Sequence, residues 1–375
     1  MNKSVCIIGA GLSGLTCGAR LAKAGFDVIV IEENTQPGGL LSVTRIGNEY
    51  LELVPHHLRK SDKALLALTR DMKVSGKIEW FDSTWYGRAA HRKVGYFTEG
   101  FVCLTRSLMQ EITDNGGRFM FSETVTEIQR TEDGRYNTVC IMSDSTVHNH
   151  VTDIVIFTGS TRTFSNVAHG LPIDMDMRDS IMDITYTASI TTLLIFKKKY
   201  SEVYYQSANI PDDLPFSRIV NHSNVFGPRG YGGNVVYLTG ECLVSDPIWI
   251  EDDATIMSDF FAGFRHLFPV ARKSDIKAWR VTKTRYAGFG KYPPQDLTCP
   301  LEGLYVCASA LTKHATTEEP ANRMDPTVAL ANDICAKIIE KNSIEQDTIS
   351  DSIVTPITGS EDASPEGDLS YEKAR

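Results

Sequence analysis

The sequence lacks any cysteine pair with the spacing of a metal site or a redox dithiol. Its eight cysteines are scattered, and none belongs to a Cys-x-x-Cys motif. The cysteine spacing therefore indicates neither a zinc site nor a redox pair, and we expect no bound metal. Reduced thiols are typical of the cytoplasm, which is the expected location.

An excess of basic residues is also absent, since the net charge of the 375-residue chain is −9. Nucleic-acid binding needs a basic surface, so this charge argues against a nucleic-acid partner. No apolar run approaches the about 20 residues of a membrane span, so none is expected. Neither is a secretory signal, because no basic segment precedes a short apolar one at the start. The expected partner is a small-molecule substrate, and the sequence does not indicate an oligomeric state.

A glycine motif with the pattern of a dinucleotide-binding turn is present near the start. Residues 4–8 are predicted to form a buried strand, Gly9, Gly11 and Gly14 follow at G-x-G-x-x-G spacing, and a helix is expected to about residue 23. The next strand, 27–32, ends in Glu32. The glycines allow a tight turn, close approach of a pyrophosphate and close helix packing, while the acidic residue can bind ribose hydroxyls. Glu32 and Glu33 disfavour NADP, because they would repel its extra phosphate.

The remaining pattern predicts alternating helices and strands followed by a β-rich segment over 184–245. Further helices are expected at 61–72, 104–115, 253–268 and 326–341, and strands at 118–121, 125–130, 138–143, 153–158, 276–287 and 303–308. Residues 343–375 are rich in Ser, Thr, Asp and Glu and have one aromatic residue. We expect them to form a disordered acidic tail.

Five residues separate Glu32 from the pair Gly38-Gly39. With this pair the sequence resembles the superfamily of flavin-containing amine oxidases and protoporphyrinogen oxidases, in which such a loop covers the cofactor. No second glycine-rich unit follows, so a separate NADPH domain is not expected. The resemblance implies FAD as the cofactor.

The segment His56-His57-x-x-x-Ser61-Asp62 extends this resemblance to a subgroup of FAD-dependent oxidoreductases, and it is broadly similar to UDP-galactopyranose mutase. The similarity covers about residues 3–342. It implies an α/β fold with a Rossmann-like FAD-binding domain of the glutathione-reductase type and an inserted substrate domain of mixed β-sheet plus helices. We expect the FAD-binding domain at 1–55, 95–160 and 276–342, and the substrate domain at 56–94 and 161–275.

The motif and the resemblance together predict the residues that contact FAD. Asp325 and Pro326 also have the pattern of a helix start, whose positive end in the family points at the flavin. The expected cofactor-binding residues are Gly9, Ala10, Gly11, Leu12, Ser13, Gly14, Glu32, Glu33, Gly38, Gly39, Leu40, Leu41, Val54, Pro55, His56, Val125, Thr158, Gly159, Asp325, Pro326, Thr327 and Val328. One departure from the family is the strand near 304–309, which lacks the usual Gly-Asp pair.

The candidates for catalysis are His56 and His57, because an imidazole beside the flavin can bind it or accept a proton near neutral pH. The alternative is that one packs in the core and the other lies at the start of the helix near Ser61. His222, Arg280 and Tyr286 are substrate-binding candidates, each with a plain core, surface or strand role as the alternative.

Three functions fit these residues. The first is an FAD-dependent oxidoreductase that removes a hydride from a C–N or C–C bond of a small molecule. The second is a non-redox mutase acting on a sugar nucleotide, which requires arginines around a diphosphate; Arg88, Arg92, Arg280 and Arg285 are available but scattered. The third is a flavin-binding protein without catalysis.

Overall fold

The centre of the molecule is a parallel five-stranded sheet. The computed structural model describes residues 3–86, 91–289, 296–312 and 324–353. The sheet has the order β18-β12-β1-β2-β8 and consists of β1 (Ser4–Ile8), β2 (Asp27–Glu32), β8 (Arg118–Phe121), β12 (Ile154–Phe157) and β18 (Leu304–Val306). Its central strands are continuous apolar runs, as expected for a parallel sheet covered on both faces. The predicted α/β fold is confirmed.

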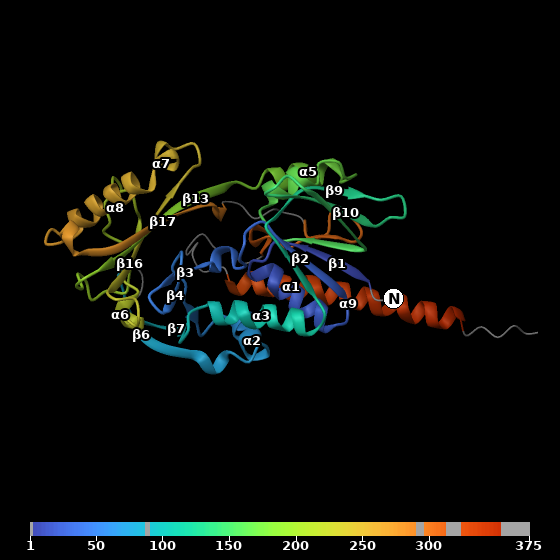
Figure 1. The fold of residues 1–375 in the computed structure, drawn as a ribbon, viewed down its shortest axis with the longest axis horizontal. Coiled ribbons are helices and arrows are strands. Elements are labelled where there is room, and N and C mark those ends of the chain that lie inside the picture. Colours follow the sequence, from blue (N-terminus) through green and yellow to red (C-terminus); the bar gives the residue numbers. More distant parts are fainter. Residues whose placement is uncertain (1–2, 87–90, 290–295, 313–323, 354–375) are drawn as a thin grey trace, which may run out of the picture.

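Helices cover one face of this sheet (Figure 1). These are α1 (Leu12–Lys23), α3 (Val102–Asp114) and the long α9 (Met324–Ile353), with α2 (Lys63–Asp71) packed beside α9. Val5, Ile7, Val28 and Val30 point from the sheet into this layer and are fully buried. The layer holds α1 rigidly, so the glycine turn before it has a fixed position.

The opposite face carries a three-stranded antiparallel meander of β9 (Glu123–Arg130), β10 (Tyr136–Met142) and β11 (Val147–Thr152). Two short helices, α4 (Thr161–Val167) and α5 (Met175–Met182), pack with it. Cys6 and Ile8 of β1 contact this layer. Neither of these helices nor β11 was predicted. Each has few apolar positions, so its sequence pattern is weak and packing against the neighbouring layer stabilises it.

The second domain is built on a mixed eight-stranded sheet of order β17-β13-β16-β15-β14-β6-β7-β5. Its strands are β5 (Leu58–Arg59), β6 (Ile78–Tyr86), β7 (His91–Phe97), β13 (Tyr186–Phe196), β14 (Tyr205–Gln206), β15 (Arg218–Val220), β16 (Asn234–Cys242) and β17 (Ile276–Phe289). Helix α8 (Asp253–Leu267) buries Phe260 and Phe264 against one face, on the left of Figure 1. The other face points toward the nucleotide turn.

Smaller elements complete the chain. A hairpin of β3 (Val43–Ile46) and β4 (Glu49–Glu52) follows the glycine pair, α6 (Ser223–Phe226) packs against β16 and β6, and α7 (Pro247–Ile250) precedes α8. Short 3-10 turns are η1 (Gly39–Leu41), η2 (Ser75–Lys77), η3 (Lys273–Asp275) and η4 (Ser309–Leu311). Within the described ranges, no helix combines the length and apolar character that crossing a membrane requires.

Several predicted boundaries need correction. Helices α2, α4 and α5 were expected in the substrate domain, but α2 packs with α9, and α4 and α5 pack with the meander. The sequence division put residues 276–342 in the FAD-binding domain, but β17 pairs with β13 along its length and belongs to the eight-stranded sheet. A disordered tail was expected from residue 343, yet α9 continues to Ile353. Composition alone does not show that a helix packed against the core can extend beyond its packed part. Residues 354–375 of that tail lie outside the described residues.

Candidate functional site

The glycine motif forms a turn that only glycine can make. Gly9 has a φ of +103°, and its N–H donates to the carbonyl of Ile31 at 2.8 Å. A Cβ on Gly14 would lie 1.9 Å from the carbonyl oxygen of Gly9, so helix and turn touch directly. Gly11 precedes α1 without any side-chain cap. The first N–H groups of α1 are therefore available to an anion such as a pyrophosphate.

The carboxylate of Glu32 supports this turn from the end of β2. One oxygen accepts from the Ala10 N–H at 2.8 Å, and the other accepts from the backbone and side-chain nitrogens of Asn34 at 3.0 and 2.7 Å. A carboxylate has about four acceptor positions, so about one remains for a ribose hydroxyl. Glu33 lines the neighbouring cavity.

The second glycine loop packs against the first. Gly38 and Gly39 have φ values of +135° and +55°, and the Gly38 N–H donates to the carbonyl of Ala10 at 2.9 Å. A Cβ on Gly39 would lie 3.1 Å from the Cα of Gly11. Both loops are thus shaped by backbone contact, which explains why the pair occurs as two glycines.

A cavity of about 560 Å³ opens at these loops and extends to the eight-stranded sheet. Among the predicted residues it is lined by Gly11, Leu12, Ser13, Glu33, Gly38, Gly39, Leu40, Leu41, Val54, Pro55, His56, Thr158, Gly159, Tyr286 and Thr327. Gly9, Ala10, Gly14 and Glu32 build the turn beside it. The structure thus brings most of the predicted cofactor residues around one space.

His56 is the member of the histidine pair that lines this cavity. Its Nε2 lies 2.8 Å from the carbonyl oxygen of Leu40, which can only accept, so Nε2 carries the proton. Burial lowers the pKa of His56 to about 4, and the ring is therefore neutral at neutral pH. Its Nδ1 has no hydrogen-bond partner among the described residues and is left as an acceptor.

The other two histidine candidates lie outside the cavity lining. His57 packs edge-on against Trp85 and Tyr204, and burial is the main cause that lowers its pKa to about 3. His222 is 1% exposed among Tyr96 and other aromatic rings, and burial lowers its pKa to about 3 as well. Both are thus neutral core histidines, which was the alternative for each.

Several other predicted residues also lie away from the cavity. Arg280 donates to the hydroxyl of Thr44 at 3.3 Å, and Val125, on β9 of the meander, packs against the core between the meander and the parallel sheet. Asp325 accepts from the N–H of Leu65 at 2.8 Å, so it caps the first turn of α2 instead of its own helix. Val328 is fully buried, and neither Val328 nor Pro326 lines the cavity. Of the loop before α9, residues 313–323 lie outside the described ranges.

The far wall of the cavity is a set of hydroxyl groups that the sequence analysis missed. Thr282, Thr191, Thr239 and Arg218 are consecutive partners across β17, β13, β16 and β15. Thr284, Ser189 and Glu241 form the next row, and all seven line the cavity. The hydroxyls of Thr191 and Thr239 are 3.1 Å apart. The one available signal was the alternation of Ser or Thr with apolar residues, as in Ser189 and Thr191.

The two charged residues of this wall form an ion pair. Arg218 Nη2 and Glu241 Oε1 are 3.2 Å apart, and the Arg218 side chain is 11% exposed. Of the arginines that a mutase would gather, Arg285 lines the cavity, Arg92 lies over the ring of Trp85, and Arg88 is outside the described residues. Of the four arginines expected for a mutase, Arg285 is therefore the one that lines the cavity in the described part of the chain.

A nucleotide turn at the carboxyl ends of a parallel sheet, opening into a cavity closed by a second sheet, is the arrangement of a two-domain dinucleotide-binding protein. The comparisons agree with this class. Residues 7–71 match the family model "NAD(P)-binding Rossmann-like domain", and residues 79–336 match "Flavin containing amine oxidoreductase". Because the second match covers more than half of the chain, the protein belongs to the flavin containing amine oxidoreductase family. Its cofactor is FAD, and it is an FAD-dependent oxidoreductase.

Solved structures share the fold at low identity. A protein from Exiguobacterium sp. 255-15 assigned as a protoporphyrinogen oxidase is 10% identical with a TM-score of 0.74, covering 91% of this chain and 99% of that one. A variant of putrescine oxidase is 11% identical with a TM-score of 0.69 and the same coverage. Phytoene desaturase from Fusarium fujikuroi is 51% identical over 43 residues, which are 12% of this chain and 8% of that relative.

Proposed function

We propose that the protein oxidises a small polar amine, with FAD bound between the glycine turn and the hydroxyl wall. The single observation that carries the proposal is the cavity that joins these two features. FAD supplies the hydride acceptor, so the chain itself needs no obligatory catalytic base. The residues of the chain bind and orient the two reactants and keep water out.

The cofactor end of the cavity is suited to the pyrophosphate and the ring system. The N-terminus of α1 and the Gly38-Gly39 loop provide backbone N–H groups without side chains in the way. His56 lines this end of the cavity as a neutral ring with its proton on Nε2, while its Nδ1 is buried. In that protonation state His56 adds no charge next to the flavin.

The substrate end favours a polar molecule. Buried polar groups that lose water need partners, so the hydroxyl wall selects a substrate that supplies them. Glu241 can accept from an ammonium group, and Arg218 can donate to a second polar group of the same molecule. An unsubstituted hydrocarbon would displace water from these groups and supply no partner beyond the pairs Arg218–Glu241 and Thr191–Thr239, so it is disfavoured.

The test is anaerobic reduction of the bound flavin by a panel of compounds. We expect amines that carry a second polar group to bleach the flavin absorbance, and apolar alkylamines or isoprenoid hydrocarbons to leave it unchanged. Bleaching by hydrocarbons alone overturns the proposed substrate class. The mutase alternative is favoured if no compound reduces the bound flavin and the protein converts a sugar nucleotide only after chemical reduction of the flavin.

A further inference from the structure

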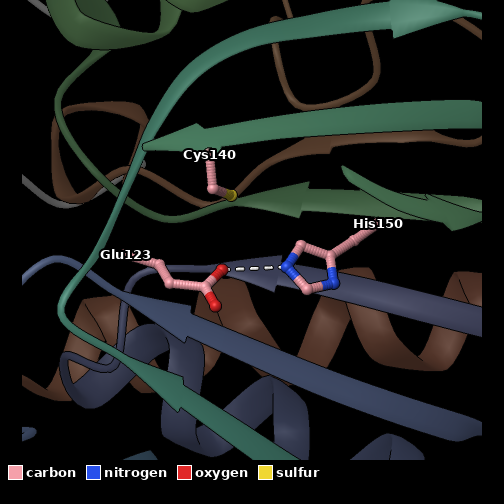
Figure 2. Close-up of side chains that lie close together, drawn as sticks. All are labelled: Glu123, Cys140 and His150. Carbon is pink, nitrogen blue, oxygen red and sulfur yellow. Dashed lines mark hydrogen bonds and ion pairs between the residues drawn. The ribbon is translucent and has the colours of Figure 1, made fainter. Parts of the chain in front are cut away.

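A second group of chemically active side chains lies outside the FAD cavity, on the inner face of the meander. Glu123 of β9, Cys140 of β10 and His150 of β11 form what we name the meander cluster, and one potential ligand atom from each lies within 4.8 Å of the other two. Figure 2 shows the Glu123 carboxylate and the His150 ring facing one another, with the Cys140 sulfur directed toward them. Three adjacent strands thus converge on one point.

Sheet register explains this convergence. Cys140 is the direct partner of His148 across β10 and β11, and His150 lies two residues further on the same face. The pairing of β9 with β10 shifts register between Val139 and Cys140. Such irregularities redirect side chains. The sequence spacing concealed the cluster because its members come from three strands, and the local signal is only the His148-x-His150 alternation.

The carboxylate of Glu123 is held as a metal ligand would be. Its side chain is 3% exposed, and its two oxygens each lie 2.8 Å from a histidine nitrogen, Nδ1 of His148 and Nε2 of His150. Burial acts to raise the pKa of Glu123, but the hydrogen bonds of the two histidines outweigh it and hold the pKa below its ordinary value. A buried charged oxygen, a thiol and an imidazole therefore share one space.

We propose that Glu123, Cys140 and His150 bind one zinc ion, with water as the fourth ligand. Zinc takes sulfur, nitrogen and oxygen ligands together, at about 2.0–2.3 Å, whereas Ca²⁺ and Mg²⁺ prefer oxygen alone. Ligand atoms around tetrahedral zinc are about 3.5 Å apart, so small side-chain shifts bring the cluster into place. His148 holds the second carboxylate oxygen and positions Glu123.

The site has both a route for the ion and a consequence for the fold. His150 is 15% exposed and His148 39% exposed at their side chains, so the ion enters from the β11 side. Zinc binds cysteine as the thiolate, so binding displaces the proton of Cys140. Bound zinc would fasten the three strands over the parallel sheet. This inference does not rest on the proposed substrate.

The experiment counts zinc in the full FAD-loaded chain. The protein is stripped with EDTA, incubated with zinc sulfate, freed of excess by gel filtration and analysed by mass spectrometry. Cys140→Ser and His150→Gln test the ligands. Cys299→Ser and His169→Gln are the matched controls, because both residues are exposed and outside the cluster. Circular dichroism checks the folding of each variant, and His150→Gln decides the question if Cys140→Ser does not fold.

We expect one zinc per chain in the wild type and in both controls, and none in the two cluster variants. His148→Ala should retain the site but weaken zinc affinity by about 10–100-fold. Zinc-free wild type, zinc retained by the folded cluster variants, or loss of zinc in a control would each overturn the proposal and leave a hydrogen-bonded triad.

Discussion

The Nε2 atom of His56 lies 2.8 Å from the carbonyl oxygen of Leu40, which joins the segment after the second glycine loop to the segment before α2. This bond determines the proton position on the ring, because a carbonyl can only accept. It places a neutral imidazole on the wall of the FAD cavity. The cavity thus has an uncharged ring beside its glycine loops, and the ion pair of Arg218 and Glu241 lies on its opposite wall.

Gly14→Ala should abolish FAD binding. The added Cβ would lie 1.9 Å from the Gly9 carbonyl oxygen, so α1 must move away from the turn. FAD affinity is measured by quenching of flavin fluorescence. Gly76→Ala is the matched control, because no atom lies within 4 Å of its added Cβ. Equal FAD affinity of the two variants would contradict the assigned role of the turn.

Glu32→Gln should destabilise the nucleotide turn and weaken FAD binding. An amide can present only one acceptor oxygen, so either the Ala10 or the Asn34 donors lose their partner. The expected loss is about 1–3 kcal/mol of unfolding free energy, measured by urea titration. Glu33→Gln lies next to it without these bonds and should change stability by less than about 0.5 kcal/mol. A larger effect of Glu33→Gln would reverse the assignment.

Stability should fall as pH decreases from about 6.5 toward 4. Burial is the first cause that lowers the pKa of His56 to about 4 and of His57 and His222 to about 3, below the ordinary 6.5. In this window the unfolded chain binds protons that the folded chain does not, at up to about 1.4 kcal/mol per pH unit for each histidine. Unfolding free energies measured from pH 7 to pH 4 test this. His222→Phe should reduce the slope, and an unchanged slope would argue against a buried neutral His222.

Arg218→Met should raise KM for the substrate and leave FAD binding unchanged. The side chain lines the substrate end and pairs with Glu241 at 3.2 Å. Removal of an interaction that is equal in ground and transition states changes KM and not kcat. The matched controls are Glu241→Gln and the double variant Arg218→Met/Glu241→Gln. Comparing the changes of the two single variants with that of the double variant gives the coupling energy between the two side chains. Loss of FAD affinity in Arg218→Met would place this residue at the cofactor instead.

The sequence predicted the geometry of the glycine turn because its signals are local. Gly9, Gly14 and Glu32 act through the backbone of one βαβ unit, so their spacing alone carries the geometry. The hydroxyl wall could not be predicted, because Thr191, Thr239 and Thr282 come together only through long-range strand register.

The histidines and Asp325 show the same limit. His56 and His57 are neighbours in sequence, but only His56 lines the cavity. The ring of His57 packs instead against Trp85 and Tyr204. Asp325 has the pattern of an N-cap and does accept from a helix N-terminus, but from that of α2. Residue type predicted the kind of interaction, and tertiary packing decided the partner.

The most direct test of the account is titration of FAD into the flavin-free wild-type chain, followed by fluorescence quenching and the visible spectrum. We predict saturation at one FAD per chain and a yellow protein after gel filtration. A folded chain that remains colourless and does not quench FAD fluorescence would contradict the assignment of the cavity between the glycine loops and the hydroxyl wall.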